Sequence, residues 1–258
     1  MKNKIFLVAC WLILFFFVFF FLSIILSIFR FINPEKNLFN NEYLKKEIYF
    51  AIKISLITSF ISSIFSLIFS LPIAYLLSRY TFPLKNLIEI ILFFPMIISP
   101  VALGTMFLIF FKTPIGIFIE NTFIRFVFEV PGLILAQLIV AFGVSVNLLK
   151  VTFDSINIEY EEIARSLGAK KINTFIYILL PLAKKGLLYT FLLAFARAFS
   201  EFGASVTLAG ATPFKTETLP IAIYLSLSSG NIYLMAILTL ISISISFFIL
   251  FLLKQIKL

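Results

Sequence analysis

The chain has 258 residues, of which 62% are hydrophobic and only 13% are charged, and its formal net charge is +9. A mean hydropathy of +1.13 lies far outside the range of soluble globular domains, in which about a quarter of the residues are charged, so the composition indicates an integral membrane protein. The chain has no histidine and a single cysteine, Cys10, which excludes an internal disulfide and removes the commonest metal ligand and general base. We therefore expect no catalytic site, no metal site and no nucleic-acid partner, since excess Lys and Arg serve membrane topology.

Apolar blocks of about twenty residues, the length that crosses a bilayer as a helix, predict six transmembrane spans. They cover residues 5–29, 51–77, 87–111, 132–149, 186–209 and 231–253. The first is expected to be a retained anchor, because its apolar run is too long for a signal peptide and no small-residue cleavage motif follows it. We expect Pro72 to kink the second span.

The basic residues predict the orientation. With a cytoplasmic N-terminus, twelve Lys and Arg residues fall on the cytoplasmic side and eight on the outside, a bias that favours cytoplasmic N- and C-termini. The loop at about 154–181 then faces the cytoplasm. No stretch is long and polar enough for a second domain, so we interpret residues 1–258 as one transmembrane domain whose core covers about 47–253.

The loop at about 154–181 is a polar segment between two apolar spans, and residues 158–167 have the pattern of a short amphipathic helix. Three glutamates fall in its first turns, where they suit the helix dipole, Asn157 can cap its start, and Gly168 can close it in a left-handed conformation. Pro181 is expected to break the run before the next span. The apolar stripe consists of Tyr160, Ile163, Ala164 and Leu167. From periodicity alone this element is either a docking surface or a hairpin packed on the protein's own helix ends.

The spacing within this loop resembles a family motif. The motif is E-x-A-x-x-x-G, followed after nine residues by I-x-L-P. It is matched here by Glu162, Ala164, Gly168, Ile178, Leu180 and Pro181. This looks like the "EAA" loop of ATP-binding-cassette importer permeases, with Ile163 where that family usually has alanine. In that family the loop holds the coupling helix, which sits in a groove of a separate ATPase subunit. The resemblance implies an ATPase-coupling role for Tyr160, Glu162, Ile163, Ala164, Leu167, Gly168 and Pro181.

Further segments resemble the molybdate branch of these permeases. They are FPMIISPVALG at 94–104, TPIG at 113–116, FARAFSEFGA at 195–204 and TETLPIAIY at 216–224. The chain departs from that branch at Ser200, at Gly143 and in the loop 210–215. Because sulfate permeases share several of these features, the choice among molybdate, tungstate and sulfate stays open.

Two ionisable residues lie inside the fifth predicted span. Arg197 and Glu201 are four residues apart on one helix face, where they can pair, and isolated charges at that depth are costly. One interpretation is a lining of the translocation pathway near its gate; the other is a structural clasp between helices. Gly203 and Ala204 just beyond them would let another helix approach closely.

The loop between the fifth and sixth spans forms the expected outer mouth. Its candidate anion-contacting residues are Thr212, Lys215, Thr216 and Thr218. Hydroxyls, backbone N–H groups and one lysine can bind a tetrahedral dianion weakly, but a tight site needs more donors to offset desolvation. We therefore expect selectivity to reside mainly in a separate extracytoplasmic oxyanion-binding protein.

No G-x-x-x-x-G-K-[ST] phosphate loop occurs in the chain. We therefore expect ATP and Mg²⁺ to be bound by a partner ATPase, and we expect this chain to bind no cofactor. The resemblance implies an all-α fold of the type I importer permease class in the cytoplasmic (inner) membrane of a bacterium or archaeon. It also implies a second copy of the chain, two ATPase subunits and the binding protein as partners. The implied function is import of molybdate or tungstate. The alternatives are a sulfate/thiosulfate permease and an ion-coupled secondary carrier.

Overall fold

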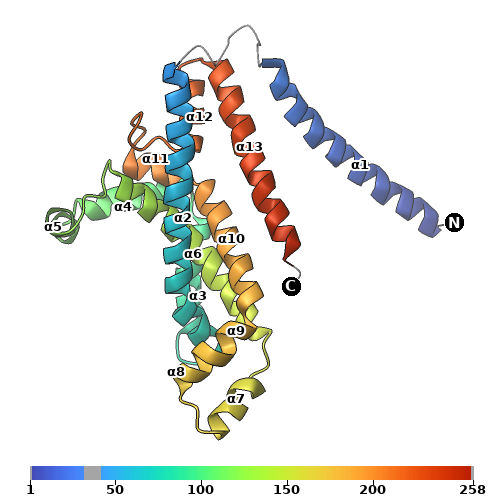
Figure 1. The fold of residues 1–258 in the computed structure, drawn as a ribbon, viewed down its shortest axis with the longest axis vertical. Coiled ribbons are helices and arrows are strands. Elements are labelled where there is room, and N and C mark those ends of the chain that lie inside the picture. Colours follow the sequence, from blue (N-terminus) through green and yellow to red (C-terminus); the bar gives the residue numbers. More distant parts are fainter. Residues whose placement is uncertain (1, 32–41, 257–258) are drawn as a thin grey trace.

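The computed structural model describes residues 2–31 and 42–256, and this part of the chain is built of helices (Figure 1). A turn of 3-10 helix, η1 (Phe29–Phe31), follows α1, and a π-helical segment, η3 (Phe175–Leu179), joins α8 to α9. The α-helices in chain order are α1 (Lys2–Ile28), α2 (Glu42–Arg79), α3 (Lys85–Ile97), α4 (Pro100–Phe111), α5 (Pro114–Thr122), α6 (Val130–Asp154), α7 (Glu159–Ser166), α8 (Lys171–Thr174), α9 (Leu180–Leu182), α10 (Lys184–Phe199), α11 (Gly203–Ala209), α12 (Leu219–Ser228) and α13 (Ile232–Gln255).

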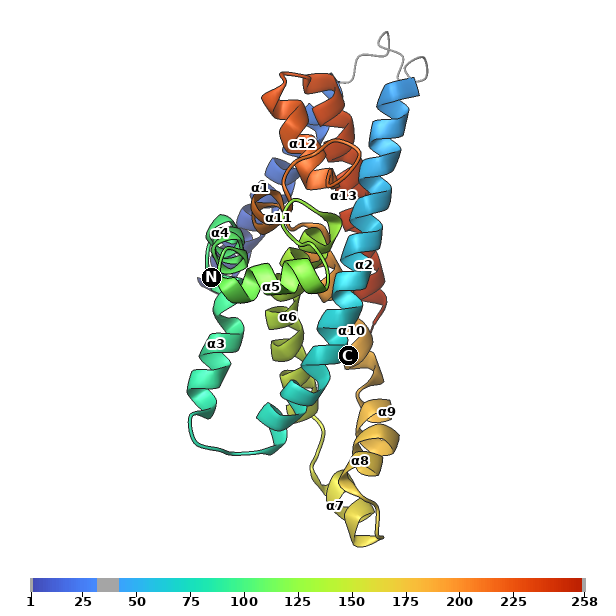
Figure 2. The same cartoon turned by 90° about the vertical axis from the view of Figure 1, so that its left-hand side faces the viewer.

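The expected all-α membrane architecture is confirmed. Within the described ranges, four helices are long and apolar enough to cross a membrane, namely α1 with η1, α2, α6 and α13, and the number rises to six when each of two bent helix pairs is taken as one span. Helices α7 and α8 form one end of the molecule, and α12 with the start of α2 forms the other (Figures 1 and 2). The side of the membrane on which each end lies stays a prediction.

The third predicted span is not one straight helix. Helices α3 and α4 meet at an angle of 109°, because Pro100 begins α4 and Ser99 before it has φ −54° and ψ 129°. A residue that precedes proline is pushed out of the helical region, so the chain turns here. Pro95 and Pro72, in contrast, lie inside α3 and α2, which continue past them.

The fifth predicted span, 186–209, is also interrupted. Helix α10 ends at Phe199 and α11 begins only at Gly203, and at its other end α10 meets the segment Lys171–Leu182 at 75°. Two short helices, α5 and α12, lie in regions expected to be loops. Each has a proline in its first turn, Pro114 at the start of α5 and Pro220 as the second residue of α12, where the missing N–H costs nothing.

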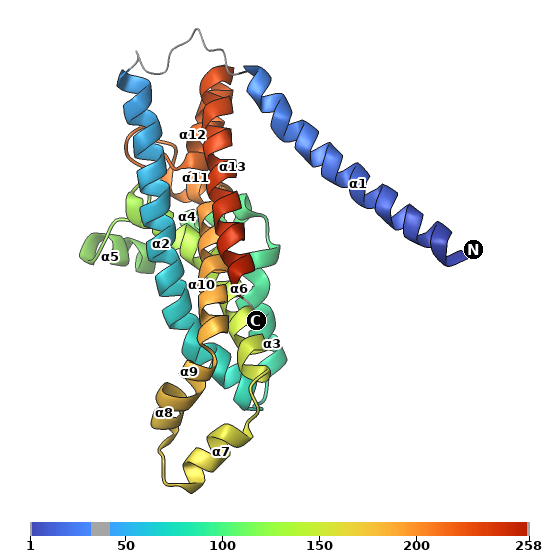
Figure 3. The same cartoon turned by 45° about the vertical axis from the view of Figure 1, so that its right-hand side comes forward.

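The centre of the bundle is the packing of α2 against α6 and α10 (Figure 3). Hydroxyl side chains on α2 face this contact, and Ser62 Oγ donates to the Ile134 carbonyl at 2.9 Å while Ser66 Oγ lies 2.7 Å from Ser145 Oγ. Small hydroxyl residues let helix backbones approach closely and still satisfy their polar groups. The buried hydroxyl residues of α2 are Ser55, Thr58, Ser59, Ser62, Ser63, Ser66 and Ser70.

Helix α1 lies apart from this bundle and approaches it near its C-terminal end, where η1 contacts α13 (Figures 1 and 3). None of its most apolar window is buried. A helix that is apolar on all sides is stable in lipid, which fits the expected role of a membrane anchor.

Candidate functional site

The amphipathic helix expected at 158–167 is α7. Its N-cap residue is Ile158 and not Asn157 as expected, because the helix begins one residue later. Asn157 Oδ1 still accepts from the Glu159 N–H at 3.1 Å, from one position outside the cap. At the other end Gly168 has φ +89°, the Gly168 N–H donates to the Arg165 carbonyl and the Ala169 N–H to the Ala164 carbonyl, each at 3.0 Å. This is the Schellman closure, which satisfies the last carbonyls of a helix and favours glycine at the left-handed position.

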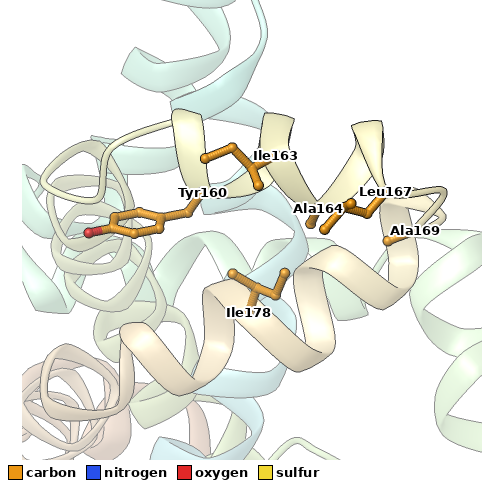
Figure 4. Close-up of a pocket in the computed structure, with 6 residues that line it drawn as sticks. All are labelled: Tyr160, Ile163, Ala164, Leu167, Ala169 and Ile178. Carbon is orange, nitrogen blue, oxygen red and sulfur yellow. The ribbon is translucent and has the colours of Figure 1, made fainter.

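The apolar stripe of α7 faces outward rather than into the protein. Tyr160, Ile163 and Leu167 are 54%, 59% and 84% exposed, whereas Ala164 is buried. Together with Ala169 and Ile178 these residues line an open groove of about 350 Å³, and Figure 4 shows Ile178 of the following segment facing the helix. Apolar side chains on a charged, projecting helix are typical of a surface that another protein covers.

The buried side of α7 carries an ion pair that the sequence analysis missed. Arg79 Nε, at the end of α2, donates to Glu161 Oε1 at 2.7 Å, and the Tyr75 hydroxyl donates to Glu161 Oε2 at 3.0 Å. The two charged side chains are only 8% and 4% exposed, and Arg79 Nη2 also donates to the Ile156 carbonyl at 2.9 Å. The contacts attach the helix to α2.

Glu161 rather than Glu162 is the anchoring carboxylate, since Glu162 is exposed. The one available signal is that Glu161 precedes the buried Ala164 by three residues and so lies on the same face of the helix. Nothing in the sequence pairs it with Arg79. A second pair at this end, Lys150 with Glu89 at 2.7 Å, ties α6 to α3.

Pro181 does not itself end the helical run. It lies in α9, and the bend follows at Ala183, between α9 and α10. The residues before it, Phe175–Leu179, form the π-helical segment. A proline ring in an α-helix clashes with the carbonyl four residues earlier, which here is that of Tyr177. The wider turn of the π-helical segment relieves this clash.

Arg197 and Glu201 pair as their spacing predicted, with Arg197 Nη1 2.9 Å from Glu201 Oε2 and Glu201 almost fully buried. The pair does not lie along one helix, however. It crosses the break between α10 and α11, and Glu201 Oε1 accepts from the Ala204 N–H at 3.0 Å. Glu201 therefore joins the end of one helix to the start of the next.

The close helix approach expected at Gly203 and Ala204 is present. A Cβ on Gly203 would lie 2.7 Å from the Pro100 Cβ, and a Cβ on Gly104 would lie 2.9 Å from the Ala204 carbonyl oxygen. Such distances are shorter than real contacts, so α4 and α11 require glycine on both sides of this crossing.

Of the predicted outer-mouth residues, Thr216 and Thr218 are buried and Lys215 is paired, whereas Thr212 is exposed. The Thr216 hydroxyl is buried, accepts from the Thr212 N–H at 3.1 Å and donates to the Gly210 carbonyl at 3.2 Å. Thr218 is also buried, and Lys215 Nζ pairs with Glu129 Oε1 at 2.5 Å. The loop bonds to itself because a nine-residue turn between two helices must satisfy its own backbone groups.

A buried carboxyl, Glu217, holds this loop from inside and was not singled out from the sequence. Its Oε2 accepts from the Phe214 N–H at 3.2 Å and the side chain is 1% exposed. Burial raises the pKa of Glu217 to about 7, and the neighbouring carboxylate of Glu47 adds to the rise, against the lowering by the Phe214 N–H.

Comparison with known proteins identifies membrane components of transport systems. The family described as "Binding-protein-dependent transport system inner membrane component" matches residues 66–256. The molybdenum transport system permease protein ModB of Escherichia coli (strain K12) is 35% identical over 154 residues, 58% of this chain and 67% of that protein. The molybdate/tungstate transport system permease protein WtpB of Methanocaldococcus jannaschii is 34% identical over 184 residues, 71% of this chain and 72% of that protein.

Among solved structures, a chain of a bacterial alginate ABC transporter, crystallised with an alginate pentasaccharide-bound periplasmic protein, superposes with a TM-score of 0.76. The match covers 98% of this chain and 94% of that chain at 18% sequence identity. This likeness shows the fold of an importer permease.

Proposed function

The chain belongs to the family of binding-protein-dependent transport system inner membrane components, and we propose that it conducts a tetrahedral oxyanion, molybdate or tungstate, through the cytoplasmic membrane. In this proposal it is the permease subunit and not an enzyme. ATP and Mg²⁺ are held by a separate ATPase subunit, since this sequence contains no phosphate loop.

The observation that carries the proposal is the exposed groove on α7 with the ion pair beneath it. Tyr160, Ile163 and Leu167 present apolar surface to a partner, and Glu161 fixes the same helix to Arg79 of α2. A helix with one face open and the opposite face bonded to a spanning helix can transmit a displacement. The proposed partner is an ATPase subunit, one for each of two copies of the chain.

The proposed route from the groove to the pathway follows the bonded elements. Displacement of α7 moves the end of α2 through Arg79, and it moves α10 through the segment from α8 to α9. At the far end of α10 the Arg197–Glu201 pair connects to α11, which packs closely on α4 at Gly104. Partner binding then shifts the population between two packings by its different affinity for each.

An extracytoplasmic binding protein supplies the anion in this proposal. Support comes from the outer-mouth loop, where the Thr216 hydroxyl is bonded within the loop and Thr218 is buried, which leaves too few hydroxyls for a tight oxyanion site. The names of the similar proteins support molybdate or tungstate as cargo.

The docking test compares Leu167→Ala and Ile163→Ala with Leu227→Ala, an exposed leucine on α12 at the other end. Truncating a leucine that becomes buried removes roughly 1.5–3 kcal/mol, so each α7 variant should bind the ATPase subunit about tenfold more weakly or worse. The Leu227 variant should bind like wild type. Equal affinity in all four proteins would refute docking on α7.

The cargo test is uptake into liposomes that contain the permease, the ATPase subunit and the binding protein. Molybdate uptake that tungstate competes for, and sulfate does not, is the expected result. Preference for sulfate or thiosulfate would support the alternative permease assignment. Uptake by the chain alone, without the ATPase, would instead support an ion-coupled carrier.

A further inference from the structure

A second groove lies beside the α7 attachment, on the outer side of α2. It is about 420 Å³ and is formed by one face of α2 against α8 and the first residue of η3. One wall consists of Pro72 and Leu76 of α2 and of Tyr80 just after its end, at intervals of four residues, with Tyr75 beside them. From the other wall it takes Lys171, Ile172 and Phe175.

The groove changes character along its length. Pro72 and Leu76 belong to a helix that crosses the membrane, and Leu76 is 50% exposed. Tyr80 lies two helical turns beyond Pro72, about 12 Å along the axis at 1.5 Å per residue, where α2 has just ended. Ile172 is 60% exposed and continues the apolar wall. The apolar run of α2 continues to Leu77 and is followed by Ser78, Arg79 and Tyr80, which indicates acyl chains at the Pro72 end and headgroups at the Tyr80 end.

The shallow end is basic. Lys171 Nζ lies 5.3 Å from the centre of the Tyr80 ring, and Lys85 Nζ donates to the Tyr80 carbonyl at 3.1 Å. Across the described ranges, neither lysine has an acidic side chain within ion-pair distance. The neighbouring cation Arg79 is neutralised by Glu161. Two ammonium groups beside one tyrosine thus remain available to an anion.

We propose that this groove binds one anionic phospholipid, with an acyl chain along Pro72 and Leu76 and the phosphate headgroup at Lys171 and Lys85. Tyrosine and lysine at the end of a membrane helix are typical of the interface, and each lysine contributes about 1 kcal/mol toward anionic lipids. A bound lipid would pack against the ring of Phe175, whose centre lies 5.0 Å from that of the Tyr75 ring. Because the Tyr75 hydroxyl donates to Glu161, the lipid would lie next to the side chains that support this carboxylate. Placement in the cytoplasmic leaflet rests on the proposed function; lipid binding does not.

The test is native mass spectrometry of the full chain in mild detergent, titrated with dioleoyl phosphatidylglycerol or dioleoyl phosphatidylcholine. Wild type should bind the anionic lipid about 30-fold more tightly, the effect expected of two lysines at about 1 kcal/mol each. Lys171→Gln should reduce that preference about fivefold. The matched control is Lys170→Gln, an adjacent exposed lysine outside the groove, which should keep it. Leu76→Trp should weaken both lipids by filling the groove, with helicity checked by circular dichroism.

Several outcomes would overturn the proposal. Equal affinity for the two lipids would mean that the groove does not select an anionic headgroup, and equal loss in the Lys170 and Lys171 variants would mean that charge acts diffusely. Unchanged binding in the Leu76 variant would place the lipid elsewhere. Loss of the lipid when the ATPase subunit is added would assign the groove to the subunit interface. The lipid affinities measured on the chain without the ATPase subunit do not depend on docking through Leu167, so failure of one proposal is distinguishable from failure of the other.

Discussion

Arg79 and Glu161 are 82 residues apart in the chain and meet at 2.7 Å, with the Tyr75 hydroxyl as a third partner. The pair is the side-chain connection between the membrane helix α2 and the water-facing helix α7, and both side chains are nearly buried. Breaking a buried pair leaves an uncompensated charge, which costs roughly 3–5 kcal/mol. Helix α7 is therefore held stiffly on one side while its other side stays open.

Glu161→Gln should loosen α7 and reduce stimulation of the ATPase subunit by the permease, because Arg79 loses its counter-charge while the apolar groove is unchanged. The measurement is ATPase activity of the assembled transporter with and without loaded binding protein. Glu159→Gln is the matched control, an exposed carboxyl in the first turn of the same helix. Equal stimulation in both variants would show that the buried pair has no part in coupling.

Two substitutions of Glu201 distinguish a role in the gate of the pathway from a role as a structural clasp between helices. Glu201→Gln keeps an acceptor for the Ala204 N–H but loses the charge opposite Arg197, whereas Glu201→Ala loses both. We expect the glutamine variant to insert and fold but to change the coupling of ATPase activity to binding-protein docking. If transport and coupling in the glutamine variant match wild type while the alanine variant loses thermal stability, the residue is a structural clasp.

The stability of the outer-mouth loop should fall as the pH rises. The pKa of Glu217 is raised from 4.5 to about 7, first by burial and then by Glu47, so the folded state holds this proton more tightly than the unfolded chain. Its contribution is fully present below pH 4.5 and is lost as the pH rises through about 7. Melting temperatures in detergent at pH 5 and pH 8 should differ less in Glu217→Gln than in wild type. Glu42→Gln, at an exposed carboxyl, should retain the wild-type difference.

Gly104→Ala should separate α4 from α11, because the new Cβ would lie 2.7 Å from the Thr207 Cβ and 2.9 Å from the Ala204 carbonyl oxygen. Overpacking of this kind costs about 1–3 kcal/mol, measured as a lower melting temperature. Thr105→Ala, one position on and exposed, should change little. A stable Gly104 variant with normal transport would mean that the crossing can widen freely.

Much of the architecture follows from local rules that the sequence displays. Apolar blocks of bilayer length identified the spans, and the charged loop identified α7, with Asn157 just before its start and Gly168 at its end. The apolar stripe of Tyr160, Ile163 and Leu167 was readable because side chains three and four residues apart share a helix face. Each of these signals is contained within a few helical turns.

The tertiary structure alone decided how the elements break and what they bond to. Pro100 determines where α3 and α4 part, but the 109° angle between them and the interruption after Phe199 accompany the packing of α4 on α11, which local hydrophobicity does not report. Glu161 rather than Glu162 anchors α7 because Arg79 lies opposite it. Glu217 and Thr216 are buried because their loop folds onto itself. Hydropathy and periodicity report what one helix prefers, whereas ion pairs and close crossings join residues tens of positions apart, whose meeting is determined only when the whole bundle packs.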